Sequence, residues 1–227
     1  METLDPDKLF TYGCSHGLFD HDGKGHFDRG GTLDASTNSS FYWIGKHLNM
    51  KLFNRSSVGA SNQRIFNKVI KDFNKFTINN IVIVQWSYID RKTYDTATVV
   101  NSANEQGNII SPFDNNKVAN IYYKHIYNET DEANMILIYS LFLEYSFPSK
   151  FYFSFVDGET VIQNSAESSL LKHFNNKCKN ITVTKKSLPL EFVDIDEKKY
   201  VLPCRHLNAE GNKLLSNLYL NKMGMDL

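Results

Sequence analysis

The heptapeptide NIVIVQW, residues 80–86, carries the strongest structural signal in the sequence. Four consecutive β-branched residues, Ile81 to Val84, favour an extended strand. A strand that is apolar on both faces is typical of a parallel sheet whose two sides are covered by helices. Residues 80–86 are therefore predicted to form a central, fully buried strand.

Strand and helix patterns alternate on both sides of this run, apart from a polar, irregular stretch at residues 94–115. Strands are predicted at residues 8–13, 51–54, 151–156 and, more weakly, 180–184. Helices are predicted at residues 41–48, 116–128, 131–145 and 211–220, and one further helix starts at Ser61 and Asn62. Such alternation predicts an α/β fold, a three-layer α/β/α sandwich with a parallel, flavodoxin-like sheet of about five strands. The helix at 131–145 is apolar on most faces and is expected to be buried core, since it is too short to span a membrane.

Composition and charge limit the kinds of molecule that the chain is expected to bind. The 227 residues, 41% of them hydrophobic, suit a single domain over residues 1–227. Lys and Arg together number 25, as do Asp and Glu, so no overall field draws the chain to nucleic acid or to an anionic membrane. The three cysteines match neither a disulfide framework nor a zinc pattern. Without a signal-peptide pattern or a transmembrane run, we expect a cytoplasmic or virion-associated protein.

Polar clusters follow the predicted strands and also precede the last helix. They are GCSH at residues 13–16, NRSSVGASN at 54–62, QWSY at 85–88 with Arg91, and PCRHLNAEG at 203–211. Because the carboxyl ends of parallel strands share one edge, we expect these clusters to meet in a crevice. No glycine-rich phosphate loop follows the first strand, which disfavours a nucleotide-binding protein.

These clusters resemble, in order, the conserved blocks of the SGNH (GDSL-like) hydrolases. The matching segments are GCSHG, NRSSVGASNQRI, VQWSYIDR and RHLNAEGN, and the resemblance spans residues 8–220. The third block, of the form W-[ST]-x-x-x-R, is similar to that of divergent members from phages and viruses. The resemblance implies a serine esterase or deacetylase that acts on a small acyl ester, with an acyl group on a carbohydrate as the favoured substrate.

The resemblance also implies a role for each matching residue. Ser15 takes the place of the nucleophile, and its own N–H is one donor of the oxyanion hole. Gly59 matches the glycine whose N–H is the second donor. Ser87 stands where the family usually has an asparagine donor, and Asn62 is the alternative for that role. His206 matches the general base that accepts the serine proton.

Two departures from the family pattern concern the residue that orients the histidine and the oxyanion donor, where Ser87 replaces the usual asparagine. The aspartate that usually precedes the histidine is replaced by Pro203 and Cys204, so no standard triad is visible. His206 is then oriented either by a backbone carbonyl, which we favour, or by a carboxylate from elsewhere in the chain. Candidate substrate contacts are His16, Trp86 and Arg91. For Trp86 and Arg91 we favour a structural role, with the Trp packed in the wall of the crevice and the Arg bridging loops, over substrate contact.

No metal ion or organic cofactor is expected. The spacing of five between His16, His21 and His26 matches no common set of metal ligands. The competing hypothesis is a catalytically weak SGNH-like module, in a virion or elsewhere, that binds a glycan or a protein. The sequence does not determine the oligomeric state.

Overall fold

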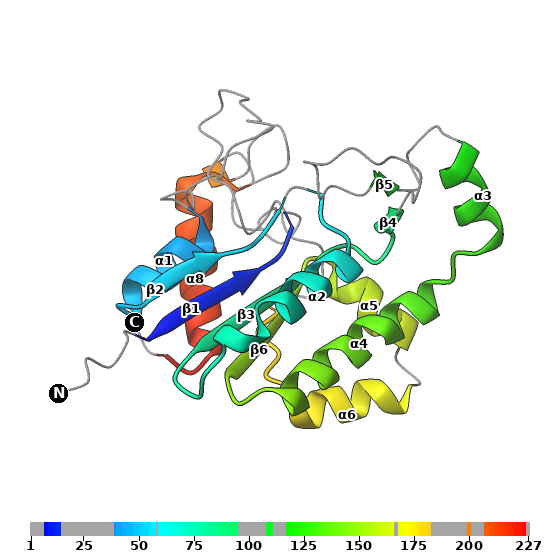
Figure 1. The fold of residues 1–227 in the computed structure, drawn as a ribbon. Helices are drawn as coiled ribbons and strands as arrows, with labels where there is room; N and C mark the ends of the chain where they lie inside the picture. Colours follow the sequence, from blue (N-terminus) through cyan, green and yellow to red (C-terminus); the bar gives the residue numbers. More distant parts are fainter. Residues whose placement is uncertain are drawn as a thin grey trace.

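The computed structural model describes residues 7–14, 39–57, 59–94, 108–110, 117–165, 168–182, 199–200 and 207–225 (Figure 1). At its centre is a four-stranded sheet in the order β2-β1-β3-β6. The strands are β1 (Lys8–Tyr12), β2 (Lys51–Asn54), β3 (Ile81–Trp86) and β6 (Lys150–Phe155), and all neighbouring pairs are parallel. The α/β class and the parallel sheet predicted from the sequence are confirmed.

Strand β3 lies in the interior of the sheet, as predicted. It pairs with β1 on one side, from Leu9↔Ile81 to Tyr12↔Val84, and with β6 on the other. All six of its residues are buried. The β-branched run therefore places apolar side chains against helices on both faces, which is the environment that its sequence indicates.

The fifth strand is reduced to a short bridge. Asn180 bridges to Phe153, whose N–H donates to Lys179 O at 2.9 Å and whose carbonyl accepts from Ile181 N–H at 2.8 Å. The Asn180 side chain then accepts the N–H of Thr182 at 2.9 Å. This local turn competes with strand pairing, so the described sheet has four regular strands where about five were predicted. Residues 183–184 lie outside the described residues.

Helices cover both faces of the sheet (Figure 1). Helices α1 (Ser40–His47) and α8 (Ala209–Lys222) pack together on one face. On the other face lie α2 (Asn62–Lys71), α4 (Glu129–Ser146) and α6 (Ser169–Lys177), with α5 (Gly158–Ser165) against α4. The three-layer arrangement predicted from the alternating pattern is present.

Side-chain caps define where several helices begin. Ser39 accepts the N–H of Tyr42 at 3.1 Å and so caps α1. Asn128 accepts the N–H groups of Thr130 and Asp131 at 2.9 and 3.3 Å, so α4 starts two residues before the predicted position. The acidic residues in the first turn of α4 favour this end further, because they face the positive end of the helix dipole.

Several short elements were not predicted. Strand β4 (Lys92–Tyr94) ends where the stretch predicted to be irregular, residues 94–115, begins, and β5 (Asn108–Ile110) lies within that stretch. Among the described strands, these two pair with each other, antiparallel. Helices α5 and α6 and the 3-10 turn η2 (Phe73–Lys75) were also missed, whereas α3 (Lys117–His125) falls inside the predicted range 116–128. Strands of three residues are too short to show an apolar alternation, so their pairing is not visible in the sequence.

No helix in the described ranges is long and apolar enough to cross a membrane.

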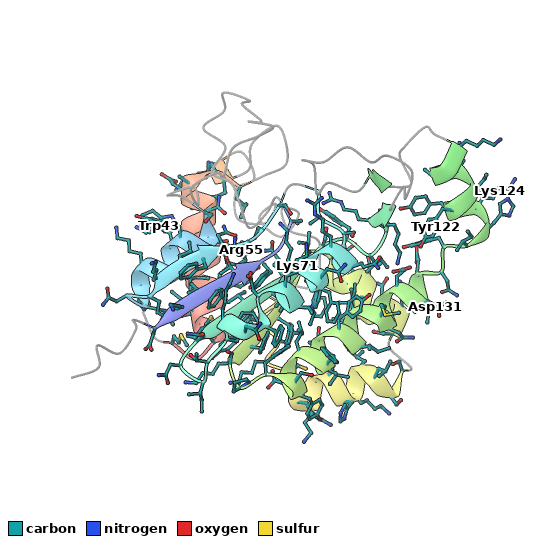
Figure 2. All side chains as sticks on the ribbon, viewed as in Figure 1. Trp43, Arg55, Lys71, Tyr122, Lys124 and Asp131 are labelled. Carbon is teal, nitrogen blue, oxygen red and sulfur yellow. The ribbon has the colours of Figure 1, made fainter. Side chains whose placement is uncertain are left out.

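A buried polar network joins β1, the end of β2 and the end of α2. The Tyr12 hydroxyl donates to Asp72 Oδ2 at 3.0 Å, and Arg55 Nε lies 3.2 Å from the same oxygen (Arg55 is labelled in Figure 2). Lys75 forms a further ion pair with Asp72. Burial, followed by the neighbouring Asp72 carboxylate, raises the pKa of Tyr12 above its usual range, so the hydroxyl stays a donor.

Replacing Asp72 is expected to lower the stability of the fold, because Asp72 joins β1 to the segment that follows β2. Asp72→Ala leaves the buried Tyr12 hydroxyl without its acceptor, so the free energy of unfolding should fall by about 2 kcal/mol. Urea unfolding followed by circular dichroism measures this loss. Asp131→Ala, at an exposed site in the first turn of α4, is the matched control and should cost less than about 1 kcal/mol. Equal losses in the two variants would contradict the role of the network.

Candidate functional site

The segments that follow the four strands are joined at one edge of the sheet. Arg55 N–H donates to Thr11 O at 2.7 Å and Ser57 N–H to Gly13 O at 3.0 Å, so the loop after β2 continues alongside the end of β1. Val156 N–H donates to Trp86 O at 2.9 Å and joins the ends of β6 and β3. The described residues of the polar clusters after the first three strands therefore lie at this shared edge.

Gly13 brings β1 close to β3 just before the predicted nucleophile. A Cβ at Gly13 would lie 3.2 Å from both Cβ and Oε1 of Gln85, so a larger residue would require Gln85 to shift by a few tenths of an ångström. Cys14, the next residue, is fully buried. The chain thus reaches position 15 from a tightly held strand end.

The loop after β2 is held by a lysine from α2. Lys68 Nζ donates to Arg55 O at 3.0 Å and to Ser57 Oγ at 2.8 Å. Gly59 follows with φ of 65°, a left-handed conformation that glycine adopts without steric cost. The turn therefore favours glycine at this position, whatever its amide does in addition.

Asn62, at the first position of α2, fastens the loop after β3. Its Oδ1 accepts the Ser87 N–H at 2.7 Å, and its Nδ2 lies within donating distance of Ser87 O at 3.3 Å and Tyr88 O at 3.2 Å. The residue is only 7% exposed. Its carboxamide is therefore occupied by backbone groups and acts as a clamp between α2 and the loop.

Ser87 lies under the guanidinium of Arg91. Arg91 donates to Ser87 Oγ at 3.3 Å, and its guanidinium carbon is 4.8 Å from the centre of the Tyr88 ring. Since Oγ accepts this bond, the hydroxyl hydrogen remains for another acceptor. Burial raises the pKa of Tyr88 to about 12, so the phenol stays protonated at neutral pH.

Two carboxylates adjoin this loop. Burial raises the pKa of the Asp90 carboxyl above its usual value. The positive charge of Arg91 lowers this pKa, and the negative charge of Asp157 raises it further. Asp157 follows β6 and accepts a hydrogen bond from Thr160 Oγ1 at 2.7 Å at the start of α5. The loop after β3 is therefore flanked by negative charge, with Arg91 as its partly buried counter-charge.

Trp86 points away from the loops, into the layer of helices. It is fully buried, its indole N–H donates to Ser140 Oγ at 2.8 Å, and its ring lies 6.0 Å from that of Tyr139. Both partners belong to α4. This geometry is that of a core residue, whereas Arg91 lies in the loop after β3 and contacts Ser87 and Tyr88.

The start of α8 is tightly fixed. Asn208 caps it by accepting the Gly211 N–H at 2.9 Å, and Asn212 Nδ2 donates to Leu207 O and Asn208 O, each at 3.1 Å. A Cβ on Gly211 would lie 2.8 Å from Tyr200 O, so only glycine fits. These contacts hold the segment that directly follows position 206.

The far end of α8 is anchored to the sheet. The Tyr219 hydroxyl accepts from Gln85 Nε2 at 3.1 Å and lies 2.8 Å from Ser154 Oγ. In Figure 1, α8 begins on the side to which the strand arrows point. Neither this anchor nor the clamps made by Lys68 and Asn212 were identified from the sequence.

Ser15, His16 and His206 lie outside the described residues, as do Pro203 and Cys204. Their predicted roles stay predictions. Within the described ranges, no group of three or more His, Cys, Asp or Glu side chains gathers as metal ligands would.

Comparison with known proteins identifies the fold. No family model and no curated protein matches the sequence. Among solved structures, a G-D-S-L family lipolytic protein from Veillonella parvula has a TM-score of 0.54 at 11% identity, over 94% of this chain and 96% of that one. LAE5, an α/β hydrolase from the Lake Arreo metagenome in Spain, also has a TM-score of 0.54, at 13% identity over 96% and 95% of the chains.

A third similar structure is a carbohydrate esterase of family 2 from Corynascus thermopiles, solved with a carbohydrate-binding domain. Its TM-score is 0.51 at 9% identity, over 97% of this chain and 67% of that one. These likenesses show that the chain has the fold of the SGNH (GDSL-like) hydrolases, as the sequence blocks indicate.

Removing the Asn62 clamp is expected to loosen the loop after β3. Asn62→Ala leaves the buried Ser87 N–H without its acceptor and two carbonyls without their donor, which should lower the free energy of unfolding by about 2–3 kcal/mol. Asn67→Ala, at an exposed position of the same helix, should change it by less than about 0.5 kcal/mol. A denaturant titration that finds Asn62→Ala as stable as Asn67→Ala would contradict the clamp.

Proposed function

We propose that the chain is a serine esterase that removes a small acyl group from an ester, with an acylated carbohydrate as substrate. The observation that carries the proposal is the joining of the segments after β1, β2 and β3 at one edge of an SGNH-hydrolase fold, through Ser57 to Gly13 and Asn62 to Ser87. The carbohydrate esterase among the similar structures supports this choice of substrate.

In the proposed reaction, Ser15 Oγ attacks the ester carbonyl carbon while His206 accepts the hydroxyl proton. The tetrahedral intermediate collapses, and the alcohol leaves with the proton returned by His206. A water molecule, deprotonated by His206, then attacks the acyl-enzyme, and the acid is released as His206 returns the proton to Ser15 Oγ. We assign the orientation of His206 to a backbone carbonyl, because Cys204 and Pro203 replace the usual aspartate.

The oxyanion hole of this proposal uses the N–H groups of Ser15 and Gly59 together with the Ser87 hydroxyl. Ser87 is preferred to Asn62 because the Asn62 carboxamide is already occupied by the backbone of Ser87 and Tyr88. Because Ser87 Oγ accepts a hydrogen bond from Arg91, the Ser87 hydroxyl hydrogen points away from Arg91 and can be donated to the oxyanion. Donors held before the reaction begins need no reorganisation in the transition state.

Substitution of Ser15 or His206 is expected to abolish hydrolysis of p-nitrophenyl acetate. Ser15→Ala removes the nucleophile and His206→Ala the base, so each should lower kcat by about 10³-fold or more. Ser146→Ala and His125→Ala, at exposed positions on α4 and α3, are the matched controls. The wild-type rate should fall below about pH 6.5 as His206 protonates. A wild-type rate equal to that of Ser15→Ala at every pH would reject the esterase and favour the binding module.

Ser87→Ala should lower kcat by about 10²-fold and leave KM nearly unchanged, because the lost bond forms only in the transition state. Ser87→Asn, which introduces the donor usual in the family, should retain more activity than Ser87→Ala. Urea unfolding of both variants separates this effect from loss of structure. A Ser87→Ala enzyme with wild-type kcat would exclude the hydroxyl from the oxyanion hole.

A further inference from the structure

Helix α4 exposes an unbroken apolar stripe. Between residues 132 and 145 its exposed positions are Met135, Ile138, Phe142 and Tyr145, with exposed fractions of 42%, 44%, 48% and 61%. No charged side chain interrupts the stripe. Surface helices of globular proteins normally carry polar residues on the outer face, so this face is unusual.

The inner face of the same helix is also apolar. Ala133, Ile136, Leu137, Leu141 and Leu143 are buried against the sheet and neighbouring helices. A helix that is apolar all round is normally buried all round. The sequence predicted this helix to be core, and in the single chain only its inner half is covered.

Aromatic side chains widen the stripe on the α2 side. Phe66 stacks on Tyr139 with ring centres 4.1 Å apart and meets Phe142 at 5.8 Å. Phe147 lies 6.4 Å from Phe142 and 6.4 Å from Phe73, which is 48% exposed. On the α6 side, the Tyr145 hydroxyl meets His173 Nε2 at 3.1 Å. The stripe thus lies in a continuous apolar surface between α2 and α6.

The spacing within the stripe favours a helical partner. Positions 135, 138, 142 and 145 are separated by three, four and three residues, which is the a/d pattern of a heptad seam. Ten residues of helix give a seam about 15 Å long. A narrow seam of this kind fits one further helix laid along it.

We propose that the stripe binds the α4 stripe of a second copy of this chain, antiparallel about a two-fold axis that passes between Ile138 and Phe142. The charges at the two ends of α4 select this partner. Glu129 and Asp131 are exposed in the first turn (Asp131 is labelled in Figure 2, at the end nearest α3), while Lys150 is exposed just beyond the other end.

An antiparallel pair sets the acidic first turn of each α4 near the partner copy's exposed Lys150 and Lys172, which belong to β6 and α6. The last turn of α4 itself has no basic residue and contains Glu144, which Lys179 faces. A parallel pair would set like charges together. A two-fold axis makes each stripe complementary to itself, so the same four side chains form both halves of the interface. The acidic first turn also opposes adsorption to an anionic lipid surface.

Sedimentation velocity over a concentration series tests the pairing with the full chain. The wild type should be a dimer, and Phe142→Glu or Ile138→Glu should raise the dissociation constant by about 100-fold or more, because each buries a charge in the seam. Ile121→Glu, the same exchange as Ile138→Glu at a site 48% exposed on α3, should leave the dimer intact. Circular dichroism checks that every variant is folded.

Two further measurements fix the orientation. The double variant Ile138→Cys with Phe142→Cys should form intermolecular disulfides joining position 138 of one copy to position 142 of the other, with the wild type as the control. Asp131→Lys and Lys150→Glu should each weaken the dimer, and the two together should restore it.

A wild type that remains monomeric at its highest soluble concentration would overturn the proposal, as would a dimer that Phe142→Glu leaves unchanged. Binding of the monomer to phosphatidylcholine vesicles, lost in Phe142→Glu, would also overturn it and assign the stripe to a lipid surface.

Discussion

The layered fold and the position of its loops depend on one constraint, the burial of β3 between two parallel neighbouring strands. Strand β3 pairs with β6 along its whole length, from Ile81↔Lys150 to Trp86↔Phe155. On its other side it pairs with β1, from Ile81↔Leu9 to Val84↔Tyr12. Parallel pairing sends the chain out of every strand at the same edge. The loops that carry Gly59, Ser87 and Asp157 therefore leave the sheet at the same edge, because the buried strand β3 pairs in parallel with its neighbours.

The sequence predicted the parts of the fold whose signal is local. The run at 80–86 and the periodic helices were correct to within a few residues, because burial on one or two faces imposes a pattern on neighbouring residues. The hairpin of β4 and β5 and the helices α5 and α6 were missed, since their positions depend on contacts with α2, α4 and β6. The predicted fifth strand is only a short bridge, because Asn180 forms a local turn with Thr182. The apolar residues beside Asn180 gave no sign of this turn.

For the described part of the candidate site, the sequence named residues but did not indicate where their side chains point. Sequence blocks identified Asn62, Ser87 and Arg91, yet only the structure shows that Asn62 holds the backbone 25 residues away and that Trp86, next to Ser87, faces α4. Gln85 and Tyr219 are separated by 134 positions and nonetheless share a hydrogen bond. Patterns of spacing report which residues share a face of one element, whereas contacts between elements depend on the packing of the whole fold.

Helix α4 connects the candidate site to the proposed dimer. Its Ser140 accepts the indole N–H of Trp86, directly before Ser87, and its Glu132 forms an ion pair with Lys92, directly after Arg91. The loop at 87–91 is thus held by α4 on both sides. A second copy on the outer face would restrict the motion of α4 and, through these two contacts, of the loop that carries Ser87. Since an oxyanion donor is effective only when it is held in place before the reaction, the proposed dimer would support the proposed role of Ser87 by keeping this loop rigid.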